Sequence, residues 1–562
     1  MKKTSETHPL RIDAVPVGHL GGLIGMTLCP GKRIAYALSG EWERDLNADF
    51  AEIAEWGASV VVSLMEHHEF SMLGVPDFAR HIPAGIEHLV LPIVDGGVPS
   101  GTWERAWTKA GPSLREKLAL GGRILIHCRG GLGRTGIVAA RLLVEFGEAP
   151  ARAMRRVRKA RPDAIENRRQ ETYVLHQCPL QSALPRPAVA VDPEKQARFC
   201  GCLLAGAAGD ALGAPVEFMG IGEIRARFGA AGIRDFVPYA GKAGAITDDT
   251  QMTLFTAEGL LRSANCGRER GIGPDFIRVI GDAYRRWLHT QGEGGGAKDQ
   301  EFLSGWLIRN LDLYARRAPG ITCLGALRAM GRDIRLADND SKGCGGVMRA
   351  APVGLFVSGW EGAGPDPVRR AFALGCDSAA LTHGHPAGQH PAGVLAVLVL
   401  RLVQGASLLE ALATARAVLT TVPDHRETLA AIDLAAKLAG QGGEPDGHLR
   451  ELGEGWVGEE ALAIALYCAL RAESLEEGVM LAVNLTGDSD STGAIAGNLL
   501  GALHGVDAIP QRWLEALELR EAIGQVADDL LSWPQWLIGE CLPSDLAEAA
   551  AAAYWWDRYP GN

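Results

Sequence analysis

Small residues recur at every fourth position in two segments that lie far apart in the chain. The first row is Gly201, Ala205, Gly209 and Gly213, and the second row is Gly493, Gly497, Gly501 and Gly505. Glycine weakens a helix, but a stripe of small side chains at helical spacing lets another backbone approach very closely. The spacing therefore predicts two helices that pack tightly together and bring distant parts of the chain into contact.

Acidic and hydroxyl side chains stand directly before the second row. Asp488 and Asp490 alternate with serines, which puts several hard oxygens near one point, as Mg²⁺ or Ca²⁺ require. Helix capping would explain this motif equally well. A second cluster, Thr247-Asp248-Asp249, precedes an apolar periodic stretch, and capping accounts for only one of its acids. Together the two clusters favour a metal site. Asp210, in the first small-residue segment, is either a further functional carboxylate or a cap.

Five separated motifs carry a family resemblance. GCLLAGAAGDALGAPVEF, TDDTQM, NDSKGCGGVMRAAPVG, THGHP and GDSDSTGAIAGNLLGALHG resemble, in this order, the ADP-ribosylglycohydrolase family over almost all of residues 197 to 540. The resemblance implies an all-α domain, here 197–562, in which two Mg²⁺ ions hold the ribose whose glycosidic bond is cut. It implies as metal ligands Thr247, Asp248, Asp249, Asp488, Asp490 and Ser491. Ser491 stands where many relatives have threonine, and its hydroxyl is retained.

The same resemblance implies residues that contact the substrate. They are Glu217, Ser341, Gly343, Gly345 and His383. Glu217 follows a proline that ends a helix, and the alternative for it is a surface glutamate. The exposed N–H groups of the glycine-rich loop 339–346 suit a diphosphate and the distal ribose, although a flexible surface loop has the same composition. For His383 the alternative is a hydrogen-bonded core residue.

The first 180 residues predict a different architecture. Short apolar runs alternate with amphipathic stretches, which is typical of an α/β fold with helices flanking a central sheet. The expected strands cover residues 58–64, 86–93 and 123–127, and the expected helices cover 42–55, 103–118 and 135–145. Residues 181–196 are rich in proline and alanine and predict a semi-rigid linker. The chain is therefore expected to be multidomain, with an α/β domain at 1–180 and a helical domain after the linker.

The strand expected at 123–127 leads into a loop of the form C-x5-R and then into a helix. Glycines between Cys128 and Arg134 allow backbone N–H groups to turn inward as an anion cradle, and the helix adds its positive N-terminus. This environment favours a thiolate at Cys128. Arg134 offers a fork for two phosphate oxygens, and Thr135 is placed to hydrogen-bond the sulfur as it leaves.

With HCRGGLGRTG at their centre, residues 20 to 180 resemble the cysteine-dependent protein phosphatases, specifically the compact dual-specificity group near the kinase-associated phosphatases. The resemblance implies a phosphocysteine intermediate on Cys128, an aspartate that protonates the leaving oxygen, and no cofactor. Asp95 on a Gly/Pro-rich loop is the expected acid, and Asp77 is its rival. Gln170 matches a position that helps to place water, although a capping or surface role is also open. Arsenate reductases share C-x5-R and are the alternative family.

Charge and cysteine content argue against several classes of function. A net charge of −11 without a basic stripe argues against general nucleic-acid binding. The 11 cysteines are odd in number and lack disulfide spacing, which favours a reducing compartment. The N-terminus has no signal-peptide core, and the run AGVLAVLVL is too short to span a bilayer. We expect a cytoplasmic protein that does not bind membranes.

These expectations combine into a bifunctional hydrolase. The C-terminal domain would cleave an ADP-ribosyl glycosidic bond with Mg²⁺, on an ADP-ribosylated protein or an ADP-ribose-containing small molecule. The N-terminal domain would hydrolyse phosphomonoesters of a phosphoprotein or a phosphorylated metabolite. The alternative function is an ADP-ribose-binding module without turnover attached to an active phosphatase, which the intact acidic set disfavours. Arginine, serine, nucleic-acid and free-metabolite linkages are all compatible with the sequence.

Overall fold

The computed structural model describes residues 2–561 apart from 19–20, 36–39, 149, 176, 178–185, 294–302, 331–333, 537 and 539–545. The chain divides into two compact units. The first unit contains the residues up to Pro187, the segment Ser304–Arg309 and the C-terminal helix α23 (Leu546–Arg558). The second unit contains the residues between Ala188 and Glu540 other than that segment.

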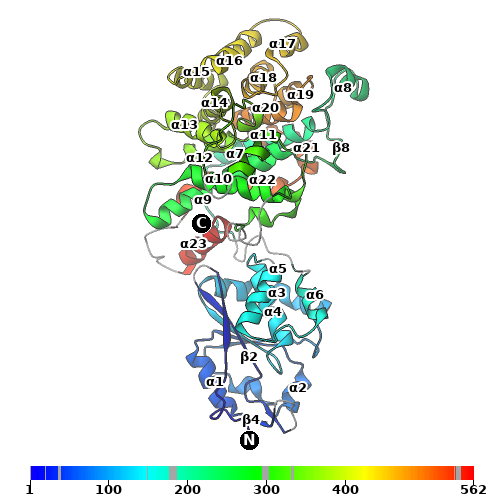
Figure 1. Ribbon diagram of the computed structural model, residues 1–562, viewed down its shortest axis with the longest axis vertical. Helices are drawn as coiled ribbons and strands as arrows, with labels where there is room; N and C mark the ends of the chain where they lie inside the picture. The colour runs from blue at the N-terminus through cyan, green and yellow to red at the C-terminus, as the bar shows by residue number, and fades with distance from the viewer. Residues whose placement is uncertain are drawn as a thin grey trace. The chain divides into compact units, whose positions relative to one another are not determined.

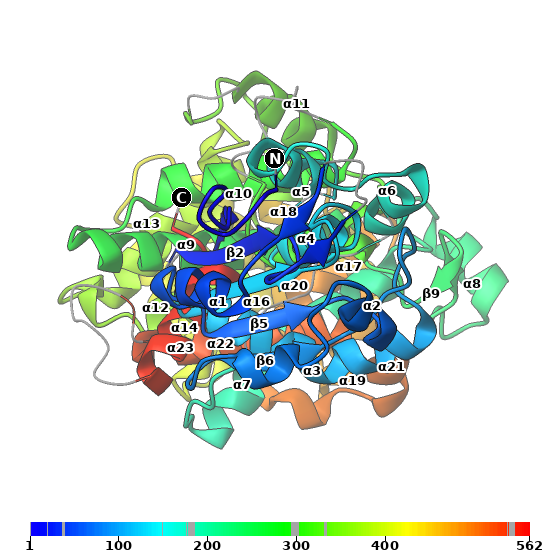
Figure 2. The same ribbon diagram turned by 90° about the horizontal axis from the view of Figure 1, so that it is seen from below.

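A five-stranded mixed sheet forms the centre of the first unit (Figure 1). Its strands follow the order β1 (Asp13–Val17), β2 (Gly22–Thr27), β7 (Arg123–His127), β5 (Val60–Ser63) and β6 (Glu87–Val90). β1 runs antiparallel to β2 and the other neighbours are parallel, and Figure 2 shows β2 and β6 on either side of β5. The carboxyl ends of the parallel strands therefore meet at one edge of the sheet, which is where ligands bind in such folds.

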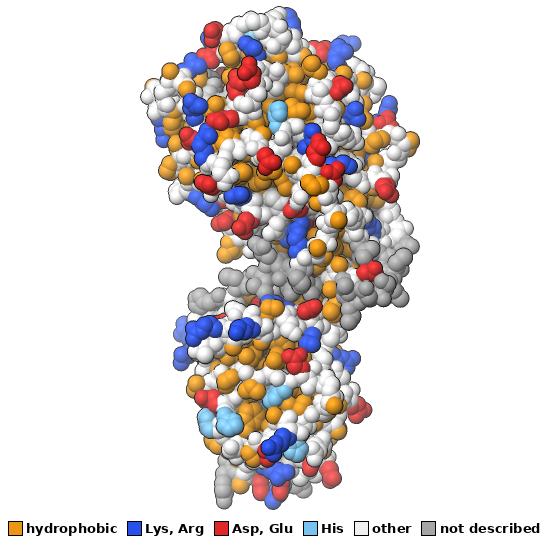
Figure 3. All heavy atoms as spheres, turned by 180° about the vertical axis from the view of Figure 1, so that it is seen from behind, with side chains coloured by type: hydrophobic (Ala, Val, Ile, Leu, Met, Phe, Trp, Pro, Cys, Tyr) orange, Lys and Arg blue, Asp and Glu red, His pale blue; other side chains and the backbone are white. Residues whose placement is uncertain are grey.

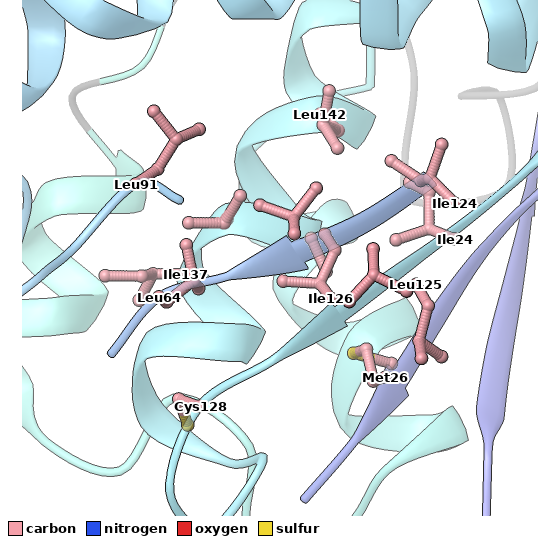
Figure 4. Packing of buried hydrophobic residues seen from close by; sticks show 14 of the residues in the cluster. Ile24, Met26, Leu64, Leu91, Ile124, Leu125, Ile126, Cys128, Ile137 and Leu142 are labelled. Atoms are coloured by element: carbon pink, nitrogen blue, oxygen red, sulfur yellow. The ribbon is translucent and has the colours of Figure 1, made fainter. Parts of the chain in front are cut away.

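The central strand β7 is buried on both faces. Ile124, Leu125 and Ile126 are each 0% exposed, as expected for a covered parallel strand. The helices α3 (Gly101–Ala119) and α4 (Gly133–Glu145) both contact β2 and β7. Figure 4 shows Ile124 and Ile126 along β7 and Cys128 just beyond its end. The apolar core thus determines where the loop after β7 begins.

Most of the α/β elements expected from the sequence are confirmed. β5, β6 and β7 lie within the predicted strands, while α1 (Leu46–Glu55), α3 and α4 coincide with the predicted helices to within a few residues. The helix expected from residue 42 is wrong at its start, because Trp42–Glu43 forms the strand β4 and pairs with β3 (Arg33–Ile34). Among the described residues up to Pro187, the other α-helices are α2 (His67–Met72), α5 (Pro150–Ala160) and α6 (Arg168–Leu175).

The sequence did not predict the strands β1 and β2. Gly22 and Gly25 interrupt the apolar pattern of β2, and the structure explains the first of them. A Cβ added to Gly22 would lie 2.0 Å from the carbonyl oxygen of Leu118, so the strand can approach the end of α3 only with glycine there.

The second unit is helical, with one short hairpin of β8 (Pro238–Tyr239) and β9 (Lys242–Ala243) among its described residues. Its helices are α7 (Pro193–Gly213), α8 (Ile221–Phe228), α9 (Asp248–Arg270), α10 (Phe276–Thr290), α11 (Ile321–Met330), α12 (Ala351–Ser358), α13 (Pro367–Ala380), α14 (Pro386–Val403), α15 (Leu408–Leu419), α16 (Arg426–Ala439), α17 (Pro445–Leu452), α18 (Gly458–Arg471), α19 (Leu475–Val483), α20 (Ser489–His504), α21 (Gln511–Ala516) and α22 (Arg520–Ser532). The expected two-part fold class is confirmed. The expected linker at 181–196 lies partly outside the described residues, and its last residues already belong to α7.

The helices α7 and α20 pack backbone against backbone. A Cβ added to Gly209 would lie 2.0 Å from the carbonyl oxygen of Gly493, and one added to Gly497 would lie 2.1 Å from that of Ala205. The predicted pairing of the two small-residue rows is therefore confirmed. Gly505 differs from the expectation, because it ends α20 as its C-cap at a φ of 81°.

Within the described residues, α14 is the helix that is long and apolar enough to cross a membrane, and 83% of its apolar window is buried inside the unit. Such burial is typical of a core helix. On the face drawn in Figure 3, Lys and Arg side chains alternate with Asp and Glu, so the coloured side chains of that face form no continuous basic stripe. The cytoplasmic location stays a prediction.

Candidate active sites

Two helix N-termini carry the predicted metal ligands of the second unit. Thr247 is the N-cap of α9, where its hydroxyl accepts the N–H of Asp249 at 3.3 Å. Asp488 is the N-cap of α20 and accepts the N–H of Ser491 at 3.3 Å. Each cluster therefore does contain one capping residue, and the remaining acids are free for another role.

Three carboxylates converge beside these caps. One oxygen from each of Glu217, Asp488 and Asp490 lies within 4.8 Å of the others, and all three residues are buried. Glu217 stands on the turn after α7, as the sequence predicted, but the structure places it among possible metal ligands and not only beside the substrate. Asp490 also accepts the N–H of Ser491, at 3.0 Å.

Asp248 and Asp249 belong to the same buried cluster. Asp248 Oδ2 accepts the N–H of Gly320 at 3.1 Å. Asp249 Oδ1 and Glu217 Oε2 are buried oxygens without a hydrogen-bond partner among the described residues. A buried carboxylate oxygen that lacks a partner is costly, so these two atoms point to a cation as the missing partner.

Asp210 accepts hydrogen bonds from the N-terminus of α9. Its Oδ2 accepts the N–H of Thr247 at 3.0 Å, the N–H of Thr250 at 3.1 Å and the hydroxyl of Thr250 at 2.5 Å. These bonds confirm the capping alternative for Asp210. Its effect on the site is to hold the N-terminus of α9, and with it Asp248 and Asp249, in place.

The cluster is electrostatically unbalanced. Burial, with a contribution from the charge of Asp490, raises the pKa of Asp210 to about 7 and the pKa of Asp248 to about 8. Burial and the charges of Asp490 and Asp488 raise the pKa of Glu217 to about 10. Hard oxygen donors with excess negative charge fit a divalent cation such as Mg²⁺ or Ca²⁺.

The predicted substrate loop and His383 lie together. A Cβ added to Gly343 would lie 3.4 Å from His383 Nε2, and one added to Gly345 would lie 3.1 Å from His383 Cε1. His383 Nδ1 is 2.8 Å from the hydroxyl of Thr382, which fixes the ring. Burial lowers the pKa of His383 to about 3, so the imidazole is neutral. His383 is thus both a hydrogen-bonded core residue and a neighbour of the loop.

Ser341 lines a cavity at the other end of this loop. Its hydroxyl lies 3.1 Å from that of Thr322 and accepts the N–H of Gly343 at 3.4 Å. The cavity has a volume of about 690 Å³, and Asn339 and Met330 are among the residues around it. Asn339 and Ser341 of the loop therefore line this cavity.

The loop after β7 in the first unit has the shape of an anion cradle. Gly131 donates its N–H to Cys128 Sγ at 3.2 Å. It adopts a φ of 73°, and a Cβ there would lie 2.2 Å from the carbonyl oxygen of Thr27. Only glycine meets both demands, which explains the glycine in the middle of the C-x5-R loop. Arg161 holds the outer side of the loop by donating to the carbonyl oxygens of Gly131 and Gly130, at 2.6 and 3.2 Å.

Arg134 is buried and held from several sides. Its guanidinium makes two hydrogen bonds to Glu69, at 2.6 and 2.8 Å, and one to the carbonyl oxygen of Ile93 at 2.9 Å. Burial alone would lower the pKa of Arg134, but Glu69 and the neighbouring Cys128 and Asp95 raise it above its usual value. Sequence reasoning missed Glu69, whose local signal is a capping box on α2 with Glu66 as N-cap.

The acid Asp95 reaches the same guanidinium. Its Oδ1 lies 2.8 Å from Arg134 Nη2, and its Oδ2 lies 3.7 Å from Arg129 Nη1, while its side chain is 57% exposed. Its loop is tethered by Gln170, which is buried and donates to the carbonyl oxygen of Gly97 at 3.2 Å. The rival Asp77 is exposed and pairs with Arg80 at 3.4 Å. The structure therefore brings Asp95 to the loop of Cys128.

Two polar neighbours of Cys128 in the sequence are buried. Thr135 Oγ1 is buried without a hydrogen-bond partner among the described residues, and its expected bond to the departing sulfur stays a prediction. His127 lies under the loop, where its Nε2 is 2.6 Å from Ser63 Oγ, which in turn is 2.9 Å from His88 Nε2. Burial, aided by His88, lowers the pKa of His127 to about 3, so this histidine is neutral.

Two family models match the chain. Residues 192–536 match the model described as ADP-ribosylglycohydrolase, and residues 36–174 match the Swiss Army Knife protein, DSP-PTPase phosphatase domain. An uncharacterized protein of Archaeoglobus fulgidus is 30% identical over 338 residues, which is 59% of this chain and 95% of that protein. ADP-ribosyl-[dinitrogen reductase] glycohydrolase of Rhodospirillum rubrum is 26% identical over 58% of this chain and 92% of its own length.

Among solved structures, a kinase associated phosphatase with a serine at its catalytic cysteine is 26% identical, covers 30% of this chain and 92% of its own, and superimposes with a TM-score of 0.27. The two family models account for the two sites separately, one for each unit. The chain therefore belongs to the ADP-ribosylglycohydrolase family and is a hydrolase that carries a dual-specificity-type phosphatase domain before its glycohydrolase domain.

Proposed function

We propose that the second unit cleaves an ADP-ribosyl glycosidic bond with two bound Mg²⁺ ions and that the first unit hydrolyses phosphomonoesters through a phosphocysteine. The observation that carries the first half is the convergence of Glu217, Asp488 and Asp490 beside buried oxygens that have no hydrogen-bond partner in the part of the chain that the structure describes. The second half rests on Cys128, Arg134 and Asp95 around one anion cradle.

In the second unit, the ions would be held by the carboxylates of Asp248, Asp249, Asp488 and Asp490 with the hydroxyls of Thr247 and Ser491. When bound, Mg²⁺ would supply positive charge that orients the 2- and 3-hydroxyls of the ribose. The carboxylates would stabilise the cation-like anomeric carbon as its bond to the leaving group breaks, and water would take the place of that group. Glu217, on the turn after α7, lies beside Asp488 and Asp490 and would contact the sugar there.

The loop 339–346 would position the rest of the ADP-ribose. The diphosphate would be bound by the hydroxyl of Ser341 and by the backbone N–H groups of Gly343 and Gly345. His383 lies next to both glycines and would hold the loop in position. The Rhodospirillum rubrum relative is named as a glycohydrolase of ADP-ribosyl-[dinitrogen reductase]. This supports an ADP-ribosylated protein as the substrate class ahead of a free small molecule.

In the first unit, Cys128 Sγ would attack the phosphorus of a phosphomonoester bound by Arg134 and the loop N–H groups. The bond from phosphorus to the leaving oxygen breaks, and Asp95 gives that oxygen its proton. Water then cleaves the sulfur–phosphorus bond and releases phosphate, with Gln170 holding the loop of the acid. No cofactor takes part in this scheme. A phosphoprotein and a phosphorylated metabolite both fit it as substrates.

The test uses the full chain and two variants that control for each other. ADP-ribosylated peptides with arginine and serine linkages are incubated with Mg²⁺, and the released ADP-ribose is measured with and without EDTA. We expect release that EDTA abolishes, that Asp488→Asn abolishes and that Cys128→Ser leaves unchanged. Phosphate release from phosphopeptides should follow the opposite pattern. Tight ADP-ribose binding without release would instead identify the second unit as a binding module.

A further inference from the structure

Two aromatic side chains lie exposed to solvent beside the carboxylate cluster of the second unit. Phe218 is 74% exposed and Trp456 is 40% exposed. Their rings stack on each other, with centroids 5.8 Å apart and planes inclined by 16°. Exposed apolar residues that stand singly are normal, whereas large rings that gather beside a site are typical of a binding surface. These two rings form the aromatic pair of the site.

Both members of the aromatic pair are tied to the carboxylates. Phe218 directly follows Glu217, which is one of the three clustered carboxylates. The carbonyl oxygen of Trp456 accepts the N–H of Cys344 at 3.2 Å. The Cys344 thiol in turn donates to Asp488 Oδ2 at 2.8 Å. The aromatic pair therefore stands at the edge of the proposed catalytic site and is not a distant surface feature.

A further carboxylate stands two residues before Trp456. The carbonyl oxygen of Glu454 accepts the N–H of Asp488 at 2.8 Å, and a Cβ added to Gly455 would lie 3.4 Å from the Cβ of Asp488. Residues 454–456 thus run along Asp488. The side chain of Glu454 is exposed and forms no ion pair within the part of the chain that the structure describes. The segment that carries Trp456 therefore also presents an unpaired negative charge.

We propose that the aromatic pair and Glu454 bind a cationic side chain that stands next to the ADP-ribosylated residue of a polypeptide substrate. The inference rests on the glycohydrolase activity of the proposed function and narrows its substrate class to basic polypeptide segments. A guanidinium or ammonium group is attracted to the face of an aromatic ring, and a carboxylate adds to this attraction. An apolar occupant would cover the rings equally well, but it would offer no partner to the carboxylate of Glu454.

The test measures the binding of matched ADP-ribosylated peptides to the full chain. The peptides of a pair differ only in the residue after the modified one, which is arginine or its neutral isostere citrulline. Pairs with an arginine linkage and with a serine linkage are both used, so that a preference for one linkage does not hide the effect. The dissociation constant is read from fluorescence anisotropy directly after mixing with Mg²⁺, before turnover. We expect the arginine peptide to bind about 5-fold more tightly than the citrulline peptide.

Three variants address the residues that would make this contact. Phe218→Leu and Trp456→Leu keep an apolar side chain and remove the ring, and Glu454→Gln removes the charge. Each should bring the ratio of the two dissociation constants closer to one. Leu409→Ala is the matched control, because Leu409 is an apolar residue on α15 that is 67% exposed. It should leave the ratio unchanged.

Equal binding of the two peptides by the original chain would overturn the inference, as would a preference for the arginine peptide that survives all three variants. Variants that weaken both peptides and free ADP-ribose by the same factor would also overturn it, because they would place the adenine ring on the aromatic pair. Failure of the proposed function looks different, since a chain that releases no ADP-ribose would still bind the arginine peptide more tightly.

Discussion

Glu69 and Arg134 form a buried ion pair with two hydrogen bonds, at 2.6 and 2.8 Å, beneath the loop that carries Cys128. The same guanidinium reaches the exposed carboxylate of Asp95 at 2.8 Å. Arg134 therefore joins an acid that holds it in the core to an acid at the surface of the site. Glu69 thus positions the guanidinium, and Asp95 pairs with it from the exposed side of the site.

Glu69→Ala should destabilise the first unit strongly. Removal of Glu69 leaves the buried guanidinium with the exposed Asp95 as its remaining charged partner, and loss of one partner of a buried pair costs about 3–5 kcal/mol. The measurement is the midpoint of urea unfolding, monitored by tryptophan fluorescence. It is made on the full chain and on a chain truncated to the contiguous residues of the first unit.

Glu171→Ala is the control for this prediction, because its carboxylate pairs with Arg158 at 2.6 Å where both side chains are more than a third exposed. Such a pair contributes at most about 1 kcal/mol. Equal losses of stability in the two variants would contradict a structural role of the Glu69 pair.

Asp95→Asn should slow the phosphatase reaction without unfolding the protein. Loss of a general acid lowers kcat by about 10²- to 10⁴-fold for alkyl phosphates, whose leaving oxygen needs a proton. Nitrophenyl phosphate should be affected much less, since its leaving group departs as an anion. Asp77→Asn, at the rival position, should leave both rates near the original. If Asp77→Asn showed the selective loss instead, the acid would be Asp77.

Gly497→Ala should destabilise the second unit, because the added Cβ would lie 2.1 Å from the carbonyl oxygen of Ala205. Forcing α7 and α20 apart is an overpacking change, for which a loss of about 1–3 kcal/mol is typical. The matched control is Gly524→Ala, on α22, where nothing lies within 4 Å of the new Cβ. There alanine should stabilise the helix by up to about 1 kcal/mol. Calorimetric unfolding of both variants would reveal opposite shifts, and shifts of the same sign would contradict the close packing.

The stability of the metal-free second unit should fall as the pH rises from about 7 to about 8. Asp210 and Asp248 have pKa values raised from 3.8 to about 7 and about 8, so the folded chain binds their protons more tightly than the unfolded chain. Their contribution is complete below the unfolded value and is lost as the pH rises through the folded values. His383, whose pKa falls from 6.5 to about 3, acts in the opposite sense but only below pH 6.5.

Unfolding midpoints in EDTA across this window check the pH dependence. Asp490→Asn removes the charge that helps to raise both values, so its decline should be shallower. Saturating Mg²⁺ should reduce the decline as well, because the cation replaces the protons. A midpoint in EDTA that rises from pH 7 to pH 8 would contradict the buried, mutually repelling carboxylates.

Local patterns sufficed wherever the chemistry lies within a few consecutive residues. The anion cradle could be predicted because Cys128, Gly131 and Arg134 belong to one strand–loop–helix stretch. The packing of α7 on α20 could be predicted because small side chains at every fourth residue form one face of a helix, and such a face is typical of close helix packing. The strands β1 and β2 escaped prediction, since Gly22 serves a contact with α3 that lies almost a hundred residues onward and leaves no local trace.

By itself, the sequence determined the two fold classes, the identity of the acidic and thiol residues, and their positions at strand or helix ends. Only the tertiary structure decided which of them meet. It paired Glu69 with Arg134, added Glu217 and Cys344 to Asp488, and gave Asp210 a capping task. The physical reason is that burial and mutual repulsion of charges depend on distances through space, which packing of the core sets and which spacing along the chain does not contain.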